Sequence, residues 1–457
     1  MMRLCIASQT PPAQPLPGAP TTEGATWKLG VDYVPQVGGV VPMMRALLAS
    51  TRGRWVAPEP LWVALGDPSL PRRFKTDEGY TVETIDLSPA VRSQYVRFKE
   101  AVWRSFHGPW GLGSFPTATY QAYVDFNHRM AQRLLEHLDS YDLIYVHDYQ
   151  LLLVGGLVGA AAPAVLRWHI PLELRGYPEQ VSRFFLRAME GFDAIVVSTR
   201  VALEELIHYG FHGRAYQVYP YVDPAEQGPV PASAVRRFRD KFGLGDHPYL
   251  LSVGRMDPVK RQDLLLRAFG RVRRRFPEHR LVLAGGSSFS TRLSSRSGGS
   301  PKDVVWSRRL GGEIRAAHLE DRVILTGRMP GEELRAAYQG AVGLVHPAPW
   351  EGFGLVGVEA WLHGLPIIVS RGAGISELVV DGVNGFVVPP GSTDGLAARM
   401  TRVLASPRRA EQMGEVGRLT ARQCTVQVAT RRLRGIFGRV QRTYRREGRT
   451  PPAFLGA

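Results

Sequence analysis

The chain has 457 residues, too many for one compact core, so two domains of roughly 200 residues each are expected. Hydrophobic residues make up 44% and charged residues 21% of it, which excludes an intrinsically disordered chain. The formal net charge is +16, but the arginines are scattered and no zinc-finger or RNA-binding spacing accompanies them, so no nucleic-acid partner is predicted.

Cysteine usage and the apolar runs indicate the compartment. Only Cys5 and Cys424 are present, which excludes a disulfide framework and fits a reducing cytoplasm. Prolines interrupt residues 1–27, so this segment lacks the apolar core of a signal peptide. The longest apolar run, residues 151–166, is too short for a membrane span and predicts a buried helix. We expect a cytoplasmic protein without an integral membrane segment, and the basic charge leaves peripheral membrane contact open.

Short runs rich in Val, Ile and Leu alternate with amphipathic segments in the first half of the chain, which is typical of parallel strands covered by helices. Strands are predicted at 3–7, 61–65, 143–146, 164–169, 194–198 and 216–219, and helices at 174–189 and 200–208. Residues 223–247 then combine prolines and glycine with a charged helix, the composition of a linker.

The second half repeats this α/β pattern. Strands are predicted at 249–253, 281–284, 322–325, 343–346 and 366–370, and helices at 262–274, 331–339 and 355–363. Residues 287–301, rich in Ser, Gly and Arg, predict a surface loop. A last long helix is predicted at 408–446.

The sharpest motif, HPAPWEGFGLVGVE at residues 346–359, lies between a predicted strand and a predicted helix. Gly352 and Gly354 let the backbone approach a ligand closely, and the free amides of the helix start would point toward a diphosphate. Glu359 could accept hydrogen bonds from ribose hydroxyls. The alternative is an ordinary strand-to-helix turn in which Glu351 and Glu359 are solvated.

A second motif, SVGRMDPVK at residues 252–260, places Arg255 and Lys260 after the first strand of the same domain, at the edge where α/β folds bind ligands. Cations there would bind a leaving diphosphate more strongly as its charge develops, and so stabilise the transition state. The alternative is a pair of solvated surface cations.

Together these motifs resemble the donor site of retaining transferases of the GT-B fold, glycosyltransferase family four, and of the related trehalose-phosphate synthases. Further matches follow at 364–366, 372–377 and 382–389, and the resemblance covers nearly the whole chain. It implies two Rossmann-like parallel-sheet domains facing across a cleft, with the last helix crossing back. We predict an acceptor-side domain at 1–224, a linker at 225–247, a nucleotide-sugar domain at 248–407, a helical segment at 408–447 that packs on the first domain, and a tail at 448–457.

The resemblance also implies a front-face retaining mechanism. In it the leaving diphosphate takes the acceptor proton, Arg255 and Lys260 hold that diphosphate, and Glu351 orients the hydroxyls of the transferred sugar. These three residues and His169 are the predicted catalytic groups. The predicted donor-binding residues are Gly38, Gly39, Arg255, Lys260, Gly352, Phe353, Gly354, Leu355, Val356 and Glu359.

Three segments of the N-terminal half carry the acceptor side of the resemblance. QVGGV at 36–40 resembles the family's glycine loop, and HDYQL at 147–151 resembles a synthase motif whose aspartate, here Asp148, binds acceptor hydroxyls. WHIP at 168–171 matches the segment whose histidine, here His169, contacts the transferred sugar. Residues 95–107 resemble an acceptor-lining segment that contributes the aromatic rings of Tyr95 and Trp103; the alternative is a helix with an aromatic stripe facing the core.

The chain departs from the synthases at the end of its first strand. They carry an arginine for the acceptor's phosphate there, whereas this chain reads Ala7-Ser8-Gln9-Thr10, and Arg292 could substitute. Whether the acceptor is phosphorylated therefore stays open. No Asp-x-Asp triplet that would clamp a metal on the diphosphate is present, so we predict a transferase that needs neither metal nor cofactor.

We thus predict a retaining hexosyltransferase, similar to a trehalose synthase, that moves a hexose, with glucose favoured, from a nucleoside-diphosphate sugar to a small sugar or polyol. The alternatives are a disaccharide phosphorylase on the same scaffold, a transferase acting on lipid-linked acceptors, and a sugar-nucleotide binder or epimerase. The nucleotide base, the acceptor, the linkage and the oligomeric state, including a homo-oligomer, stay open.

Overall fold

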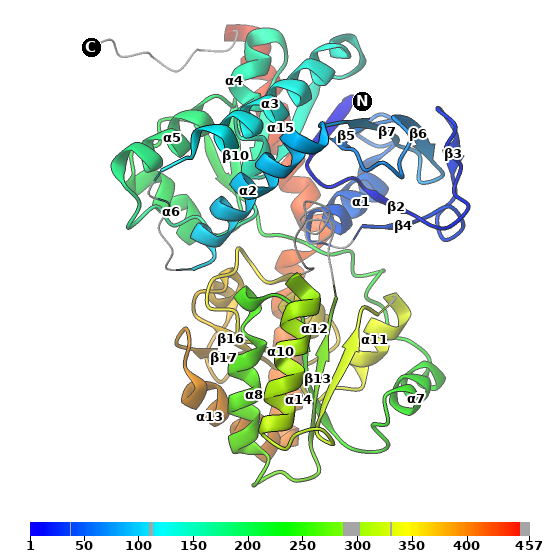
Figure 1. Cartoon of the computed structure of the whole chain (residues 1–457), viewed down its shortest axis with the longest axis vertical. Coiled ribbons are helices and arrows are strands. Elements are labelled where there is room, and N and C mark those ends of the chain that lie inside the picture. The colour runs from blue at the N-terminus through cyan, green and yellow to red at the C-terminus, as the bar shows by residue number, and fades with distance from the viewer. Residues whose placement is uncertain (37, 109–111, 113, 287–301, 330, 448–457) are drawn as a thin grey trace. The chain divides into compact units, whose positions relative to one another are not determined.

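The chain folds into two compact units, each with its own parallel sheet. The computed structural model describes residues 1–36, 38–108, 112, 114–286, 302–329 and 331–447. The first unit contains residues 1–219 and the chain from 429 onward, and the second contains residues 220–428. Figure 1 shows helices against the sheet in each unit. Two α/β units, each built on a mostly parallel sheet, agree with the α/β architecture that the sequence predicts.

The sheet of the first unit has the strand order β11-β10-β9-β8-β1-β5-β7-β6-β3. The strands are β1 (Leu4–Ser8), β3 (Thr26–Trp27), β5 (Leu61–Leu65), β6 (Arg73–Thr76), β7 (Thr81–Ile85), β8 (Leu143–His147), β9 (Ala164–Arg167), β10 (Ala194–Val197) and β11 (Ala215–Gln217). Strand β1 pairs in parallel with both β5 and β8, and β6 runs antiparallel to β7. A separate hairpin joins β2 (Ala13–Pro15) to β4 (Tyr33–Pro35). The direction of strand succession therefore reverses between β1 and β8, at the centre of the sheet.

Helices that connect these strands cover the sheet, and the end of the chain adds one more. They are α1 (Val40–Thr51), α2 (Pro89–Phe106), α3 (Thr117–Leu135), α4 (Val154–Val158), α5 (Glu179–Glu190), α6 (Arg200–His208) and α15 (Val426–Glu447). In α15, Leu433, Ile436, Phe437 and Val440 are buried, and the Phe437 ring lies 5.0 Å from that of Tyr145 on β8. Figure 1 accordingly shows the red end of the chain among the blue-to-green elements of this unit.

The second unit has a fully parallel sheet with the order β14-β13-β12-β15-β16-β17. The strands are β12 (Tyr249–Val253), β13 (Arg280–Ala284), β14 (Val323–Gly327), β15 (Gly343–His346), β16 (Ile367–Ser370) and β17 (Gly385–Val388). The helices are α7 (Ala232–Lys241), α8 (Gln262–Val272), α10 (Lys302–Ala316), α11 (Gly331–Gln339), α12 (Leu355–Leu362), α13 (Thr393–Ala405) and α14 (Pro407–Ala421). Here the succession reverses between β12 and β15.

The predicted last helix at 408–446 is wrong as a single element, because it is interrupted. Helix α14 ends at Ala421, and Thr425 forms an isolated bridge with Val222 before α15 begins. Helix α14 packs on α12 of its own unit, where a Cβ on Gly414 would lie 1.8 Å from the Gly364 carbonyl oxygen. Residues 408–428 therefore belong to the second unit, and only α15 from 429 onward belongs to the first.

Two further predictions need correction. The predicted linker at 225–247 is part of the second unit: the charged helix that the sequence predicts there is α7, which packs on α11, and the Val230 amide donates to Gln339 Oε1 over 2.8 Å. The predicted buried helix at 151–166 contains only the short α4, because Gly159 has a positive φ of 53° and β9 begins at Ala164. Glycine is tolerated there because it lacks a Cβ.

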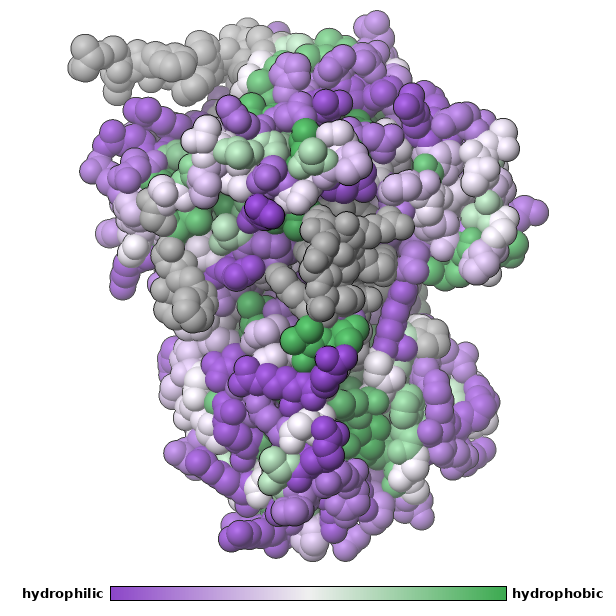
Figure 2. Space-filling view, viewed as in Figure 1, coloured by the Kyte–Doolittle hydropathy of each residue, from purple (hydrophilic) through white to green (hydrophobic). Residues whose placement is uncertain are grey.

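None of the helices that the structure describes is long and apolar enough to cross a membrane. The face drawn in Figure 2 is mostly hydrophilic, with smaller hydrophobic patches between the hydrophilic residues.

Candidate functional site

In each unit, some of the predicted site residues follow a strand at which the strand order reverses. In open α/β sheets the carboxyl ends of these strands border the usual ligand crevice, because their connections leave in opposite directions. In the second unit Arg255 and Lys260 follow β12, and Glu351 follows β15. In the first unit Asp148 follows β8, and Gln9 follows β1.

An ion pair brings the two motifs of the second unit together. Lys260 Nζ contacts Glu351 Oε2, and the two side chains are only 13% and 17% exposed. His346, the last residue of β15, places its Nε2 3.6 Å from the same carboxylate oxygen. Lys260 and Glu351 are thus held side by side at the carboxyl ends of β12 and β15. A lysine there can bind a phosphate, and a glutamate can accept hydrogen bonds from sugar hydroxyls.

A second loop fixes the backbone around Glu351. The Glu351 amide donates to the Gly372 carbonyl over 3.1 Å, and the Gly374 amide donates back to the Glu351 carbonyl over 3.0 Å. A Cβ on Gly372 would lie 1.8 Å from the Pro349 carbonyl oxygen, so only glycine allows this approach. The glycines of the 372–374 segment therefore act on Glu351 through the backbone.

The glycine turn after Glu351 leads directly into α12. Gly354 has a φ of 99°, which favours glycine, and it caps the helix that Leu355 and Val356 begin. Gly352 and Phe353 are buried in the turn, and the Ile375 amide donates to the Phe353 carbonyl over 2.7 Å. The amides of the first turn of α12 are the groups that the sequence predicts for a diphosphate.

Glu359 lies one turn farther along α12 and has a partner that the sequence did not reveal. The Tyr338 hydroxyl of α11 donates to Glu359 Oε2 over 2.7 Å, and the Tyr338 ring stacks on His363 with centroids 5.3 Å apart. Burial raises the pKa of Glu359, while the hydrogen bond from Tyr338 opposes that rise. Tyr338 thereby fixes one carboxylate oxygen and leaves the other for a ligand.

Arg255 and Lys260 lie on a short loop with its own supports. Asp257 Oδ1 accepts from the Val259 amide over 3.1 Å and so caps the single turn Pro258–Lys260. The Gln262 side chain donates to the Arg255 carbonyl over 2.9 Å. Both supports are local in the chain, but no sequence motif indicated them.

Asp148 is the centre of the site in the first unit, and its backbone is strained. Its φ of 70° and ψ of 174° fall in a region that is essentially restricted to glycine. Its Oδ1 accepts from the His169 amide over 3.2 Å. Burial raises the pKa of Asp148 to about 7, although hydrogen bonds from the His169, Tyr149 and Ile170 amides oppose the rise.

His169 also contacts a second histidine, which the sequence did not single out. His147 Nδ1 lies 2.9 Å from His169 Nε2, and the two rings are inclined by only 19°. Burial and the nearby Arg167 cation lower the pKa of His147 to about 3. Burial, followed by His147 and Arg167, lowers the pKa of His169. Both rings are therefore neutral at physiological pH.

The aromatic residues of α2 divide between two environments. Tyr95 is buried and its hydroxyl donates to Gln9 Oε1 over 2.6 Å, while burial and then the charges of Tyr123 and Asp148 raise its pKa. Trp103 lies two turns farther along α2, half-buried, and stacks on His107 at 3.6 Å. Tyr95 thus ties α2 to the end of β1, while Trp103 stays a predicted acceptor residue.

The remaining predicted residues are at the start of α1 or outside the described chain. Gly38 is exposed with a φ of 145°, and Gly39 is the N-cap of α1. Arg292 and the predicted loop at 287–301, like the predicted tail at 448–457, lie outside the described residues. Within the described ranges no group of three His, Cys, Asp or Glu side chains could hold a metal ion.

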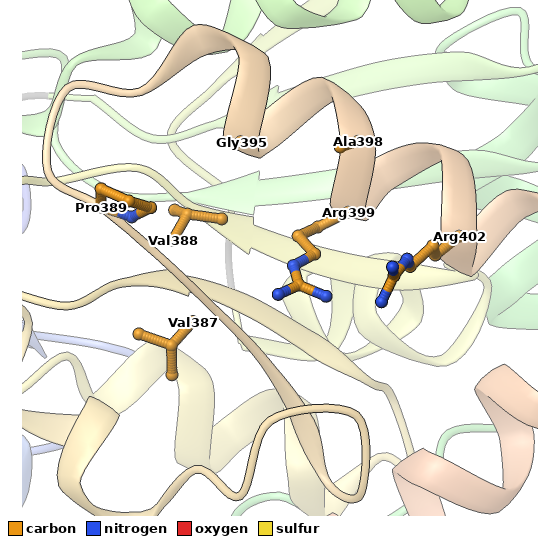
Figure 3. A pocket seen from close by; sticks show the side chains of 7 residues that line it. All are labelled: Val387, Val388, Pro389, Gly395, Ala398, Arg399 and Arg402. Carbon is orange, nitrogen blue, oxygen red and sulfur yellow. The ribbon is translucent and has the colours of Figure 1, made fainter.

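A separate cavity of about 270 Å³ lies between β17 and α13, lined by Val387, Val388, Pro389, Gly395, Ala398, Arg399 and Arg402 (Figure 3). Arg399 is paired with Asp381 over 2.9 Å and lies over the Phe386 ring, so its guanidinium is already engaged. This cavity has none of the predicted site residues.

Two family models match the chain in separate parts. Residues 235–420 match "Glycosyl transferases group 1" and residues 14–167 match "Glycosyltransferase family 20". The first match contains every predicted donor residue of the second unit, and the second contains Asp148 and Tyr95.

Individual proteins are similar over different shares of the chain. A GDP-mannose-dependent α-(1-6)-phosphatidylinositol monomannoside mannosyltransferase of Mycolicibacterium smegmatis is 33% identical over 44% of this chain and 49% of its own length, so the chain spans only about half of that relative. A D-inositol 3-phosphate glycosyltransferase of Thermobifida fusca is 30% identical over 68% of this chain and 72% of its own length. A solved α,α-trehalose-phosphate synthase of Burkholderia xenovorans covers 95% of this chain and 100% of its own with a TM-score of 0.76 and 19% identity, and so shows the fold alone.

Proposed function

Since the chain belongs to the group 1 glycosyltransferases and has the GT-B fold, we propose that it transfers a hexose from a nucleoside-diphosphate sugar to a small sugar or polyol, with retention at the anomeric carbon. Glucose is the hexose we favour, and a trehalose-like disaccharide the product class. The second unit would bind the donor and the first unit the acceptor. The observation that carries the proposal is the half-buried pair of Lys260 and Glu351 at the edge where the strand order reverses.

The chemistry of the donor residues supports this assignment. Lys260 and Arg255 would neutralise the diphosphate as the bond to the sugar breaks, which stabilises the transition state more than the ground state. Glu351 would orient the sugar hydroxyls, and Glu359 would accept from the ribose. The departing diphosphate would take the proton of the attacking hydroxyl on the same face of the sugar.

The acceptor side favours a neutral hydroxyl compound. Gln9 stands at the end of β1, and its amide oxygen is bonded to Tyr95, so this strand end offers no cation to a phosphate. Asp148 is buried and would accept hydrogen bonds from hydroxyls. We therefore propose glucose or a polyol rather than a sugar phosphate as the acceptor.

The test is a screen for nucleoside diphosphate release. Purified protein is incubated with UDP-, GDP- and ADP-sugars together with glucose, glucose 6-phosphate, glycerate or glycerol phosphate. Release that depends on both donor and acceptor supports the proposal, and a product with the donor's anomeric configuration supports retention. Phosphate-dependent cleavage of a disaccharide without nucleotide would instead show a phosphorylase.

A lipid-linked acceptor is the second candidate, because the mycobacterial relative is named for a phosphatidylinositol mannoside. The Arg-rich α15 adds a physical reason, since residues 426–447 carry seven arginines and one glutamate. Sedimentation with anionic and neutral liposomes at low and high salt separates the two candidates. Salt-sensitive binding to anionic vesicles with faster turnover on a lipid acceptor would favour the second.

We also propose that transfer needs no divalent metal, because Arg255 and Lys260 would supply the positive charge that the diphosphate requires. Turnover should be unchanged in the presence of a chelator. Loss of turnover that magnesium or manganese restores would contradict this proposal.

A further inference from the structure

Two neutral histidines form a hydrogen-bonded pair at the Asp148 site, and only His169 has a role in the proposed function. His147 is the last residue of β8 and is 1% exposed, so it is shielded from solvent. Its Nδ1 lies 2.9 Å from His169 Nε2. His169 is thereby fixed at two points, through this ring contact and through its backbone amide on Asp148.

The shared proton has two alternative placements. A neutral imidazole carries one N–H, so one ring must donate and the other must accept. If His147 donates from Nδ1, its Nε2 is bare and His169 carries its own proton on Nδ1. If His169 donates from Nε2, His147 carries its proton on the buried Nε2, and His169 Nδ1 is bare.

The surroundings of His147 favour the first placement. Its Nε2 is buried and has no hydrogen-bond acceptor among the residues that the structure describes. A buried N–H without an acceptor is rarer than an under-satisfied acceptor, because the lost hydrogen bond to water is not replaced. In addition, Arg167 pairs with His147 across β8 and β9, and its positive charge lowers the pKa of the ring. This cation therefore helps to keep His147 neutral, so that the pair holds one N–H between its two facing nitrogens.

We propose that His147 is a positioning residue which holds His169 as the Nδ1–H tautomer, so that His169 presents a hydrogen-bond donor to a hydroxyl oxygen of the bound sugar. This inference rests on the proposed function for its sugar ligand, but not for the pairing of the rings. In this arrangement His169 orients a hydroxyl and does not remove a proton from it. His147 itself touches no substrate.

Three substitutions at His147 separate a tautomer role from a structural one. In His147→Asn the side-chain amide can take the place of Nδ1 and donate to His169. In His147→Gln the amide reaches to the position of Nε2, and in His147→Leu no donor remains. We expect His147→Leu and His147→Gln to lower kcat roughly tenfold, as a misplaced contact near the reacting atoms does, and His147→Asn to recover most of it. The KM of the donor should change little in all three.

The decisive readout is the protonation of His169, measured by nitrogen-15 NMR of histidine-labelled protein, with His169→Gln used for assignment. We expect a protonated Nδ1 in the wild type and in His147→Asn, and a shift toward protonated Nε2 in His147→Leu. A wild-type His169 protonated on Nε2, or one whose tautomer is the same in His147→Leu, would overturn the inference. So would equal turnover of His147→Asn and His147→Leu.

Failure of the proposed function gives a different result. If the wild type releases no nucleoside diphosphate with any donor and acceptor, the proposed transfer fails. The NMR comparison then still decides the pairing, because it needs no substrate.

Discussion

The two strand-order reversals carry sites built on opposite electrostatic principles. In the second unit a cation and an anion lie in contact, and glycine loops fix the backbone around them. In the first unit burial suppresses charge, since the pKa of Asp148 is raised and those of His147 and His169 are lowered. A buried lone acid can lose its charge near neutrality. We therefore expect a change of pH to act mainly on the site of the first unit, and removal of a charged side chain to act mainly on the site of the second unit.

The largest effect should follow from removal of the cation in the second unit. We expect Lys260→Ala to lower kcat by about 100-fold, because the developing charge of the diphosphate loses a charged contact. Steady-state kinetics with saturating donor measure this. Lys241→Ala is the matched control, since Lys241 also pairs with a glutamate, Glu333, but is 59% exposed. Near-normal turnover of Lys260→Ala would remove Lys260 from the proposed role.

A smaller effect should come from pH at the first unit's site. Because the pKa of Asp148 is about 7, its carboxylate forms as pH rises through neutrality, and a carboxylate accepts more hydrogen bonds from an acceptor sugar than the acid does. We expect kcat/KM for the acceptor to rise about tenfold between pH 6 and pH 8. Asp148→Asn should give a low value without this rise.

The same residue links pH to stability. The pKa of Asp148 in the folded chain exceeds its ordinary value of 3.8, so the folded state binds more protons between these values. The free energy of unfolding should therefore fall as pH rises from about 4 to about 7. Asp148→Asn should lose this part of the pH dependence in denaturant titrations. An identical slope in both proteins would contradict the assigned pKa.

Removal of the hydrogen bond that Tyr338 donates to Glu359 should change the KM for the nucleotide sugar by a few fold. In Tyr338→Phe the Glu359 carboxylate loses the hydroxyl that donates a hydrogen bond to it. We expect the KM for the nucleotide sugar to rise about fivefold, which is the order of effect of one lost hydrogen bond. Tyr209→Phe, on the surface of the first unit, is the control. An unchanged KM would show that Glu359 needs no partner to bind the ribose.

The smallest effect concerns the backbone of Asp148. Its φ and ψ favour glycine, so Asp148→Gly should be more stable than Asp148→Ala by about 1 kcal/mol, although both should lose acceptor binding. Urea titrations of the two variants measure the difference. Greater stability of the alanine variant would show that the strain is relieved elsewhere.

The sequence predicted much of the fold because its strands are buried on both faces. Continuous apolar runs gave β5, β12 and β15 with their observed bounds, and most other predicted strands end within about two residues of the observed ones. Strands β6 and β7 were missed because they mix polar and apolar residues near the sheet edge. The break between α14 and α15 was missed because a bridge to Val222, far away in the chain, causes it.

The residues of the candidate sites were likewise predicted only in part. Short motifs carried Arg255, Lys260 and Glu351, and the structure places the last two in contact. Tyr338 and His147 gave no such signal, because each acts through a residue that is close in space but about twenty positions away. A single sequence therefore indicates the residues that would contact a ligand better than the residues that position them.

The last helix has a consequence for the order in which a nascent chain can mature. Residues 1–219 emerge first from the ribosome, but the ring of Tyr145 on β8 is covered by Phe437 of α15. The second unit needs no residue beyond 428. During synthesis the unit made second can therefore complete its core while the unit made first still waits for the final helix, which leaves an apolar sheet surface for chaperones to protect.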